Sequence, residues 1–196
     1  INSLKGNLGS YPDWLIICNN DILFTDKKFF QKLKKIDIEK YPIIGPDIIN
    51  SNGKPLNPFM ISPLSKLRTF YWKLYFLSYF ISIIMLFTKR WLTPFLIKSN
   101  SEKIITSKTV YAVHGSAILF SNYFFRHGGW LDDNFEMYGE ELTVAEIAKK
   151  LDLPITYYPE LKITHFEHQS TGFSDKRSLY SKAKDSYKYF ESVYLR

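Results

Sequence analysis

Three short polar motifs carry residue types that could do chemistry. Asn19-Asn20-Asp21 and His165-Phe166-Glu167-His168 each follow an apolar run, and Glu140-Glu141 opens a helical pattern. Asp21 offers the oxygen ligand that a hard divalent cation prefers, and one His, such as His165, could share that ion. Glu140 and Glu141 could supply a carboxylate base, whose basicity depends on burial and on the neighbouring acid.

Each motif also has a purely structural interpretation. An Asx cluster after a strand is commonly a turn or a helix cap. Two acids at a helix N-terminus stabilise the helix through its dipole. His168 could be a surface or capping residue. The residues alone leave both interpretations open for each motif.

The elements that position these motifs alternate between strands and helices. Ligand sites of such folds lie outside the carboxyl ends of the strands, where these motifs fall, so we expect an α/β or mixed layer fold. Apolar runs predict strands at 13–18, at 41–49 with a break at Gly45-Pro46, in two pieces within 110–120, at 155–158 and at 162–166. Helical patterns are expected at 27–36, 140–150 and 178–194, with a short helix ending at Gly128-Gly129.

Length and composition favour one globular domain. The chain has 196 residues, 45% of them hydrophobic, which excludes a disordered or collagen-like protein. One cysteine and no signal peptide at the start of the chain favour the cytosol. The net charge of +7 comes from residues 1–98, which hold 14 Lys and Arg against 6 Asp and Glu.

An apolar stretch over residues 69–88, flanked by Arg68, Lys89 and Arg90, has three interpretations. It could be an interfacial helix, an ordinary buried helix or a membrane span, which needs about 20 apolar residues. Tyr71, Tyr75, Ser78, Ser82 and Lys89 fall in one sector of a helical wheel, which would face water, whereas Lys73 lies opposite. The flanking cations favour an anionic membrane surface. Nucleic acid is the least favoured partner, because no zinc spacing, RNP-like strand or helix-turn-helix pattern accompanies the charge.

The order of the motifs resembles that of the inverting family 2 glycosyltransferases of the A-type fold, most closely a rhamnosyltransferase-like branch that builds bacterial surface polysaccharides. The resemblance covers roughly residues 10–172 and rests on N-N-D, V-H-G-S-A-I-L-F, G-W-L-D-D-N-F-E-M-Y-G-E-E and Y-Y-P-E-L-K-I-T-H-F-E-H-Q-S. It implies a three-layer nucleotide-diphospho-sugar transferase fold, in which helices flank a mixed sheet. It also implies that residues 1–196 are a single partial domain, N-terminally truncated before the metal-binding strand, with an insertion at 64–96 that associates with membranes.

The resemblance implies a role for each matching residue. Asp21 and His165 would hold Mg²⁺ or Mn²⁺ on the donor diphosphate, with Asn19 and Asn20 on the donor. Gly115 and Ser116 would form a small-residue turn that lets backbone approach donor and acceptor. Asp132 would hold acceptor hydroxyls or order its loop. Glu141, the second acid of the Glu140-Glu141 pair, would be the catalytic base.

Two departures from the family pattern favour an alternative. The expected base is Asp, whereas Glu141 is one methylene longer, and the helix that follows lacks the usual acid and Arg. The first expectation is an enzyme at the cytoplasmic face of the cell membrane that transfers a sugar from a nucleotide-sugar donor to a lipid-linked glycan. The alternative is an impaired transferase-like scaffold at the membrane. A metal-dependent phosphohydrolase that uses Asp21 and His165 is a weaker third, because the clustered ligands of a two-metal site are missing.

Overall fold

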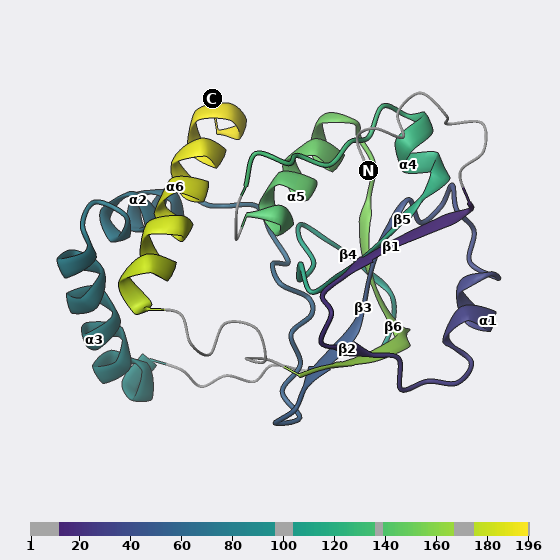
Figure 1. Ribbon diagram of the computed structural model, residues 1–196, viewed down its shortest axis with the longest axis horizontal. Coiled ribbons are helices and arrows are strands. Elements are labelled where there is room, and N and C mark those ends of the chain that lie inside the picture. The colour runs from purple at the N-terminus through teal and green to yellow at the C-terminus, as the bar shows by residue number, and fades with distance from the viewer. Residues whose placement is uncertain (1–11, 97–103, 136–138, 167–174, 196) are drawn as a thin grey trace.

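A six-stranded mixed sheet forms the centre of the computed structural model, which describes residues 12–96, 104–135, 139–166 and 175–195 (Figure 1). The strands are β1 (Trp14–Cys18), β2 (Ile22–Leu23), β3 (Ile43–Asn50), β4 (Lys108–Val110), β5 (Ala117–Ser121) and β6 (Ile155–His165). Their order is β1-β5-β3-β6-β2, and β4 also pairs with β6. β3 and β6 are parallel, whereas the other pairs are antiparallel. The expected mixed sheet is thereby confirmed.

Helices cover both faces of this sheet. Successive side chains of a strand point to opposite faces, so Leu119 of β5 packs under α1 (Phe29–Leu33), with Phe29 and Leu33. Phe120 packs on the other face, with α4 (Asn122–Arg126) and α5 (Glu140–Lys150). The α/β class with helices flanking a mixed sheet is therefore confirmed, and α5 has the bounds expected from the sequence.

The predicted strands 155–158 and 162–166 are one continuous strand, β6, so the prediction of two strands is wrong. The register with β3 jumps from Pro46↔Tyr158 to Asp47↔Lys162, which leaves three residues of β6 in a bulge. Pro159, in that bulge, has no backbone N–H to give to the ladder. A bulge interrupts the pairing locally while the strand continues beyond it.

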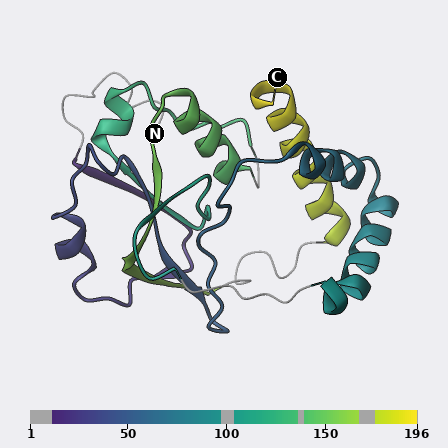
Figure 2. The ribbon, with the colours of Figure 1, turned by 180° about the vertical axis from the view of Figure 1, so that it is seen from behind.

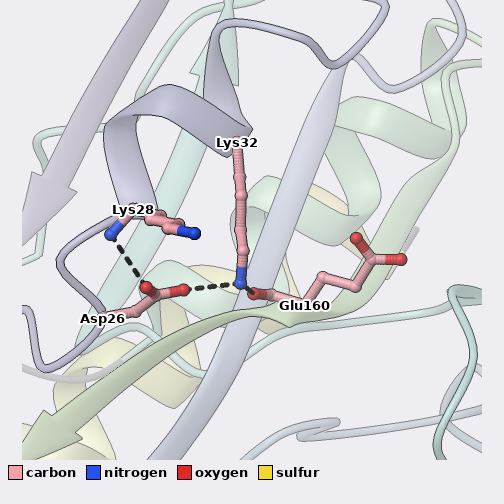
Figure 3. A network of polar contacts seen from close by, with 4 residues as sticks. All are labelled: Asp26, Lys28, Lys32 and Glu160. Carbon is pink, nitrogen blue, oxygen red and sulfur yellow. Dashed lines mark hydrogen bonds and ion pairs between the residues drawn. The ribbon is translucent and has the colours of Figure 1, made fainter.

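The helix predicted over 27–36 is shorter, because α1 spans only Phe29–Leu33. Before it, the backbone N–H of Lys28 donates to Oδ1 of Asp26 at 2.8 Å. Lys32 Nζ then joins Asp26 Oδ2 at 2.6 Å to the backbone oxygen of Glu160 at 3.0 Å, which ties α1 to β6 (Figure 3). Residues 34–36, at the end of the predicted helix, instead form a turn in which the Ile36 N–H donates to the backbone oxygen of Leu33. In a second turn, Oδ1 of Asp37 accepts from the backbone N–H groups of Glu39 and Lys40.

Three helices lie together beside the sheet: α2 (Lys66–Tyr75), α3 (Tyr79–Leu96) and α6 (Lys176–Tyr194), with α3 described by its backbone alone from residue 89. Figure 1 shows this grouping at one side of the sheet, and Figure 2 shows it from behind. The apolar stretch 69–88 is therefore two helices with a break at 76–78. Within the described part of the chain, no helix combines the length and hydrophobicity that a bilayer crossing requires.

Aromatic side chains of α6 pack against α2 and the break after it. The Tyr187 ring stacks on Phe76 with centroids 4.8 Å apart and meets Trp72 edge-on at 5.8 Å. Lys73, which interrupts the apolar pattern of the sequence, forms an ion pair with Glu191 of α6 at 2.6 Å. One side of the helix pair is thus covered by α6.

The expected water-facing stripe is wrong for Ser82, which is buried, whereas Tyr75 is partly exposed. Ser82 is 2% exposed, and its hydroxyl donates to the backbone oxygen of Tyr79 at 2.6 Å. Tyr75 packs against Tyr180 of α6, whose hydroxyl donates to the Tyr75 backbone oxygen at 3.2 Å. The break at 76–78 separates the two helices, and α6 covers positions that a single isolated helix would show to water. The side chain of Lys89 lies outside the described residues.

Apolar side chains of α2 and α3 instead face solvent. Leu67 is 78% exposed and Phe80 is 72% exposed. The other exposed members of what we call the α2–α3 apolar face are Phe70, Leu74, Leu77, Ile83, Ile84, Leu86 and Phe87. Single exposed apolar residues are ordinary, whereas many on one helix pair are typical of a surface that binds a partner or a membrane.

Candidate active site

Asp21 and His165 lie side by side at one end of the sheet. The turn after β1 leads into β2, and β2 pairs antiparallel with the end of β6, with Ile22 opposite His165. This pairing places Nε2 of His165 3.0 Å from Oδ1 of Asp21, and each side chain is only 8% exposed. The structure therefore brings together the two residues predicted to share a cation.

One polar atom of each of these two side chains has no hydrogen-bond partner in the described part of the chain. Three buried side-chain polar atoms there lack a hydrogen bond, and two of them are Oδ1 of Asp21 and Nδ1 of His165. The 3.0 Å contact itself does not have hydrogen-bond geometry. Two ligands at adjacent octahedral positions, each about 2.1 Å from Mg²⁺, are about 3 Å apart. The separation of these two atoms is therefore compatible with two ligands of one divalent cation.

Two ligands are fewer than a protein cation site usually provides. Among the residues that the structure describes, no group of three or more His, Cys, Asp or Glu side chains is arranged to hold a metal ion. A cation at Asp21 and His165 would need additional ligands, such as water or substrate phosphate oxygens. His168 lies outside the described residues, so the structure does not place it.

The turn at residues 114–116 lies next to this pair. The backbone N–H of Asn19 donates to the backbone oxygen of Ser116 at 2.9 Å, at the end of the β1–β5 pairing. His114 Nδ1 lies 2.9 Å from the hydroxyl oxygen of Ser116, and the His114 and His165 rings meet edge-on at 6.1 Å. Asn19 and Asn20 are exposed beside it. The predicted donor-binding residues are therefore neighbours of the candidate cation ligands.

The side chains of Glu140 and Glu141, at the start of α5, lie against Gly115 of the same turn. The backbone N–H of Gly115 donates to Oε1 of Glu141 at 3.0 Å. A Cβ atom on Gly115 would lie 2.6 Å from Cγ of Glu140 and 2.9 Å from a carboxylate oxygen of each acid. Gly139, immediately before α5, has φ +116°, a left-handed conformation that favours glycine. Both glycines are thus required by the geometry that brings the acids to the turn.

Both acids have raised pKa values. Burial raises the pKa of Glu141, and the backbone amides of Glu141, Gly115 and Gly139 oppose this in part. Burial also raises the pKa of Glu140, and the negative charge of Glu141 raises it further, against the opposing effect of its own amide and of His114. Glu140 is exposed as a whole residue, but its carboxylate end lies against Gly115, where the turn and Glu141 displace water. Paired carboxylates with raised pKa values are typical of catalytic sites.

A pocket of about 320 Å³ opens beside these acids. Its polar lining consists of Gly115, Asp132, Asp133, Glu140 and Thr143. The remaining lining is apolar and comes from the sheet, from α5 and from Leu131: Ile17, Ile118, Phe120, Leu131 and Val144. A mostly apolar pocket with a few polar groups is typical of a small-molecule site. Of the two acids, Glu140 is the one that lines it.

Asp132 anchors α6 as well as lining the pocket. Its Oδ2 accepts hydrogen bonds from the Tyr194 hydroxyl at 2.6 Å and from the Tyr189 hydroxyl at 2.9 Å. Burial tends to raise its pKa, but hydrogen bonds from Tyr194, Asn134 and Tyr189 outweigh this and hold the pKa of Asp132 below its usual value. The structure thus gives Asp132 an ordering role in the loop before α5.

Asn57 and His114 belong to the site but were not among the residues predicted from the sequence. The buried Asn57 side chain accepts from the backbone N–H of His114 at 2.7 Å and donates to the backbone oxygen of Pro46 at 2.8 Å. Asn57 thereby fixes the 114–116 turn to β3. The segment around Asn57 has the composition of a turn-rich loop, and no motif in it predicted a role for Asn57 in the site. His114 stands within the V-H-G-S-A motif, which was a usable signal.

A scan of the chain against models of protein families finds no match, and a search of curated proteins finds no significant relative. The geometry of the site therefore carries the functional assignment that follows.

Proposed function

We propose that the protein is an inverting glycosyltransferase of the A-type fold, which transfers a sugar from a nucleotide-diphosphate donor to a hydroxyl of a lipid-linked glycan. One observation carries the proposal: the 114–116 turn connects the candidate cation ligands to the candidate base. The backbone oxygen of Ser116 accepts a hydrogen bond from the N–H of Asn19 at 2.9 Å, and Asn19 is two residues before Asp21. The N–H of Gly115 donates to Oε1 of Glu141 at 3.0 Å. Sugar transfer requires a leaving-group site and a base close to one another, and both candidates lie beside this one small turn.

The reaction exchanges one bond at the anomeric carbon for another. The acceptor oxygen bonds to this carbon while the bond from the carbon to the diphosphate oxygen breaks, and the electron pair leaves with the diphosphate. The acceptor proton passes to a carboxylate of the Glu140-Glu141 pair. A Mg²⁺ or Mn²⁺ ion held by Asp21 and His165 would stabilise the negative charge of the departing diphosphate. Attack opposite the leaving group inverts the anomeric configuration.

The residues around the turn are suited to hold the two substrates. Asn19 and Asn20 are exposed beside Asp21, where their amides could bind the sugar or ribose of the donor. Gly115 and Ser116 present backbone with little side-chain bulk. The pocket beside Glu140 offers the Asp133 carboxylate to sugar hydroxyls, and Asp132 orders the loop that lines it. We assign the donor to the Asp21 side of the turn and the acceptor to the pocket.

The α2–α3 apolar face supports a membrane-bound acceptor. Its exposed side chains include Leu67 and Phe80, and the cations Lys66 and Arg68 stand at the start of α2. Apolar side chains together with Lys and Arg favour binding at the interface of an anionic bilayer. The proposed enzyme is accordingly a peripheral protein at the cytoplasmic face of the membrane.

One feature of α5 favours the second candidate, an impaired transferase-like scaffold. Thr143 lines the pocket at the position where the family carries an acid, and its hydroxyl donates to the backbone oxygen of Gly139 at 3.0 Å. A scaffold would bind a nucleotide sugar with Mn²⁺ but transfer nothing.

Donor consumption distinguishes the two candidates. Purified protein is incubated with Mn²⁺, vesicles that carry a polyprenyl-diphosphate sugar, and in turn UDP-glucose, UDP-galactose, GDP-mannose and dTDP-rhamnose. We expect one donor to be consumed by the wild type and by Asp26→Ala, because Asp26 is bonded to Lys32 of α1 and lies outside the candidate site (Figure 3). We expect no consumption by Asp21→Ala. Binding of a donor without consumption of any would support the scaffold.

A further inference from the structure

We propose that Glu140 is the general base of this site and that Glu141 is a positioning residue that holds the Gly115 turn. The inference rests on the proposed transferase function and deepens it. It reverses the roles that the resemblance implies, in which the second acid of the pair is the base. The geometry of the two side chains, which share one glycine, assigns the roles.

Glu141 is occupied by the backbone. Its Oε1 accepts the Gly115 N–H at 3.0 Å, and the amides of Glu141 and Gly139 also stabilise its charged form. A lone pair that accepts such a hydrogen bond is less available to an incoming proton. A carboxylate held in this way keeps its place, which suits a residue that fixes the turn between donor and acceptor.

Glu140 is open to a ligand. It lines the 320 Å³ pocket, whereas Glu141 is not among the lining residues. Asp133 lines the same pocket and offers a carboxylate to acceptor hydroxyls. A base must come within hydrogen-bond distance of the proton that it removes, so the acid that lines the pocket meets the first requirement.

The charges around Glu140 make it a better base. The groups that face it are Glu141 on α5, His114 in the turn, and Asp132 and Asp133 in the loop before α5. Burial and the Glu141 charge raise the pKa of Glu140, and His114 opposes them. A carboxylate with a raised pKa holds an abstracted proton more firmly near neutral pH. Glu141 thus supports the proposed base in two ways: it holds the Gly115 turn, and its negative charge raises the pKa of Glu140.

The proposed step conserves atoms and charge. The acceptor hydroxyl gives its proton to a carboxylate oxygen of Glu140 as its oxygen bonds to the anomeric carbon of the donor. The bond between that carbon and the diphosphate oxygen breaks, and the diphosphate takes the electron pair. Protonated Glu140 then returns its proton to water. Glu141 takes no proton in this sequence.

Three glutamine variants test the division of roles: Glu140→Gln, Glu141→Gln and, as a control on the same helix, Glu146→Gln, which keeps an acceptor for the Tyr111 hydroxyl. Transfer is measured with the four donors and the lipid acceptor named above. We expect Glu140→Gln to lose about 10²- to 10⁴-fold in kcat. Glu141→Gln keeps an oxygen for the Gly115 N–H, so we expect a loss of about tenfold or less. Activity that fails in Glu141→Gln but persists in Glu140→Gln overturns the inference.

Two further readouts separate a positioning role from a general loss of structure. In the wild type, kcat/KM should rise with pH through the pKa of the base. In Glu141→Gln this rise should move to lower pH, because a neighbouring negative charge is gone; an unmoved or upward-shifted rise contradicts the inference. Carbon NMR of the labelled Glu carboxyl groups, assigned with the variants, should show the same shift for Glu140 without turnover.

The outcomes also distinguish this inference from the proposed function. A wild type that transfers no sugar from any of the donors contradicts both. A wild type that transfers sugar, with Glu141→Gln as the inactive variant, contradicts only the division of roles. A Glu140 carboxyl that titrates at the ordinary value in the NMR experiment contradicts the division of roles even where transfer is found.

Discussion

Nε2 of His165 lies 3.0 Å from Oδ1 of Asp21, although 143 positions separate them in the chain. The pairing of β2 with the end of β6 brings them together, with Ile22 opposite His165. Both side chains are buried, and neither Oδ1 of Asp21 nor Nδ1 of His165 has a hydrogen-bond partner among the described residues. Buried polar atoms without partners are costly, which is consistent with a site that a bound ion completes.

The first prediction concerns cation binding. We expect Asp21→Ala and His165→Ala each to weaken Mn²⁺ binding by about tenfold or more in the presence of UDP, because each removes one of two protein ligands. Isothermal titration calorimetry measures the affinity, and Asp26→Ala serves as the control, at a partly exposed Asp outside the candidate site. Equal Mn²⁺ affinity in the wild type and both variants would count against the cation site.

A second prediction concerns Gly115. Its alanine variant would place Cβ 2.6 Å from Cγ of Glu140 and 2.9 Å from Oε1 of Glu141. We expect the acids to be displaced, with transfer reduced at least tenfold and the free energy of unfolding lowered by about 1–3 kcal/mol. Urea unfolding and the transfer assay measure the two effects. An alanine variant with wild-type transfer would show that the approach of the acids to this turn is unimportant.

The third prediction concerns Asp132 and acid stability. The pKa of Asp132 is lower in the folded protein than in the unfolded chain, so its ionised form favours folding at pH values above the unfolded value of about 3.9. This contribution is lost as the pH falls from there through the lower folded value. We expect Asp132→Asn to lower the free energy of unfolding by about 1–2 kcal/mol at pH 6, because the Tyr189 and Tyr194 hydroxyls lose a charged acceptor.

Urea unfolding at a series of pH values checks this expectation. The stability difference between the wild type and Asp132→Asn should shrink below pH 4, as Asp132 of the wild type becomes protonated. A difference that stays constant between pH 6 and pH 2 would mean that the charge of Asp132 does not hold α6.

The fourth prediction concerns the α2–α3 apolar face. Phe80→Glu adds a negative charge at a side chain that is 72% exposed, and we expect it to reduce binding to anionic vesicles several-fold. Phe30→Glu, on α1, is the matched control, since Phe30 is also an exposed phenylalanine but lies outside this face. Co-sedimentation with phosphatidylglycerol vesicles measures binding. A wild type that ignores vesicles and instead forms a dimer, disrupted by Phe80→Glu, would assign the face to a second copy of the chain.

Local patterns predicted much of the fold. The apolar run at 13–18 is β1, and the helix expected at 140–150 has those bounds, because Gly139 and the apolar periodicity define it locally. The predictions failed where contacts between segments far apart in the sequence determine the structure. Ser82 is buried because of the break at 76–78 and the cover by α6, and β6 is continuous because β3 pairs on both sides of its bulge.

Part of the candidate site could also be predicted from local sequence patterns. Asp21, Gly115 and His165 each follow or precede a strand at one end of the sheet, so their motifs could be expected to meet. Asn57 could not be expected, because its role comes from hydrogen bonds to Pro46 and His114, which lie far from it in the sequence. Glu140 lines the pocket and Glu141 bonds to the Gly115 turn because their side chains point in different directions, which the sequence does not reveal.

The most direct test of the central claim is the structure of the product that the protein makes. With Mn²⁺, a nucleotide-diphosphate sugar and the lipid-linked acceptor, NMR of the product should show a new glycosidic bond with the anomeric configuration inverted relative to the donor. Asp21→Ala should yield no product. Release of phosphate or free sugar without a glycosidic product, a retained configuration, or undiminished product from Asp21→Ala would contradict the claim that this protein is an inverting glycosyltransferase.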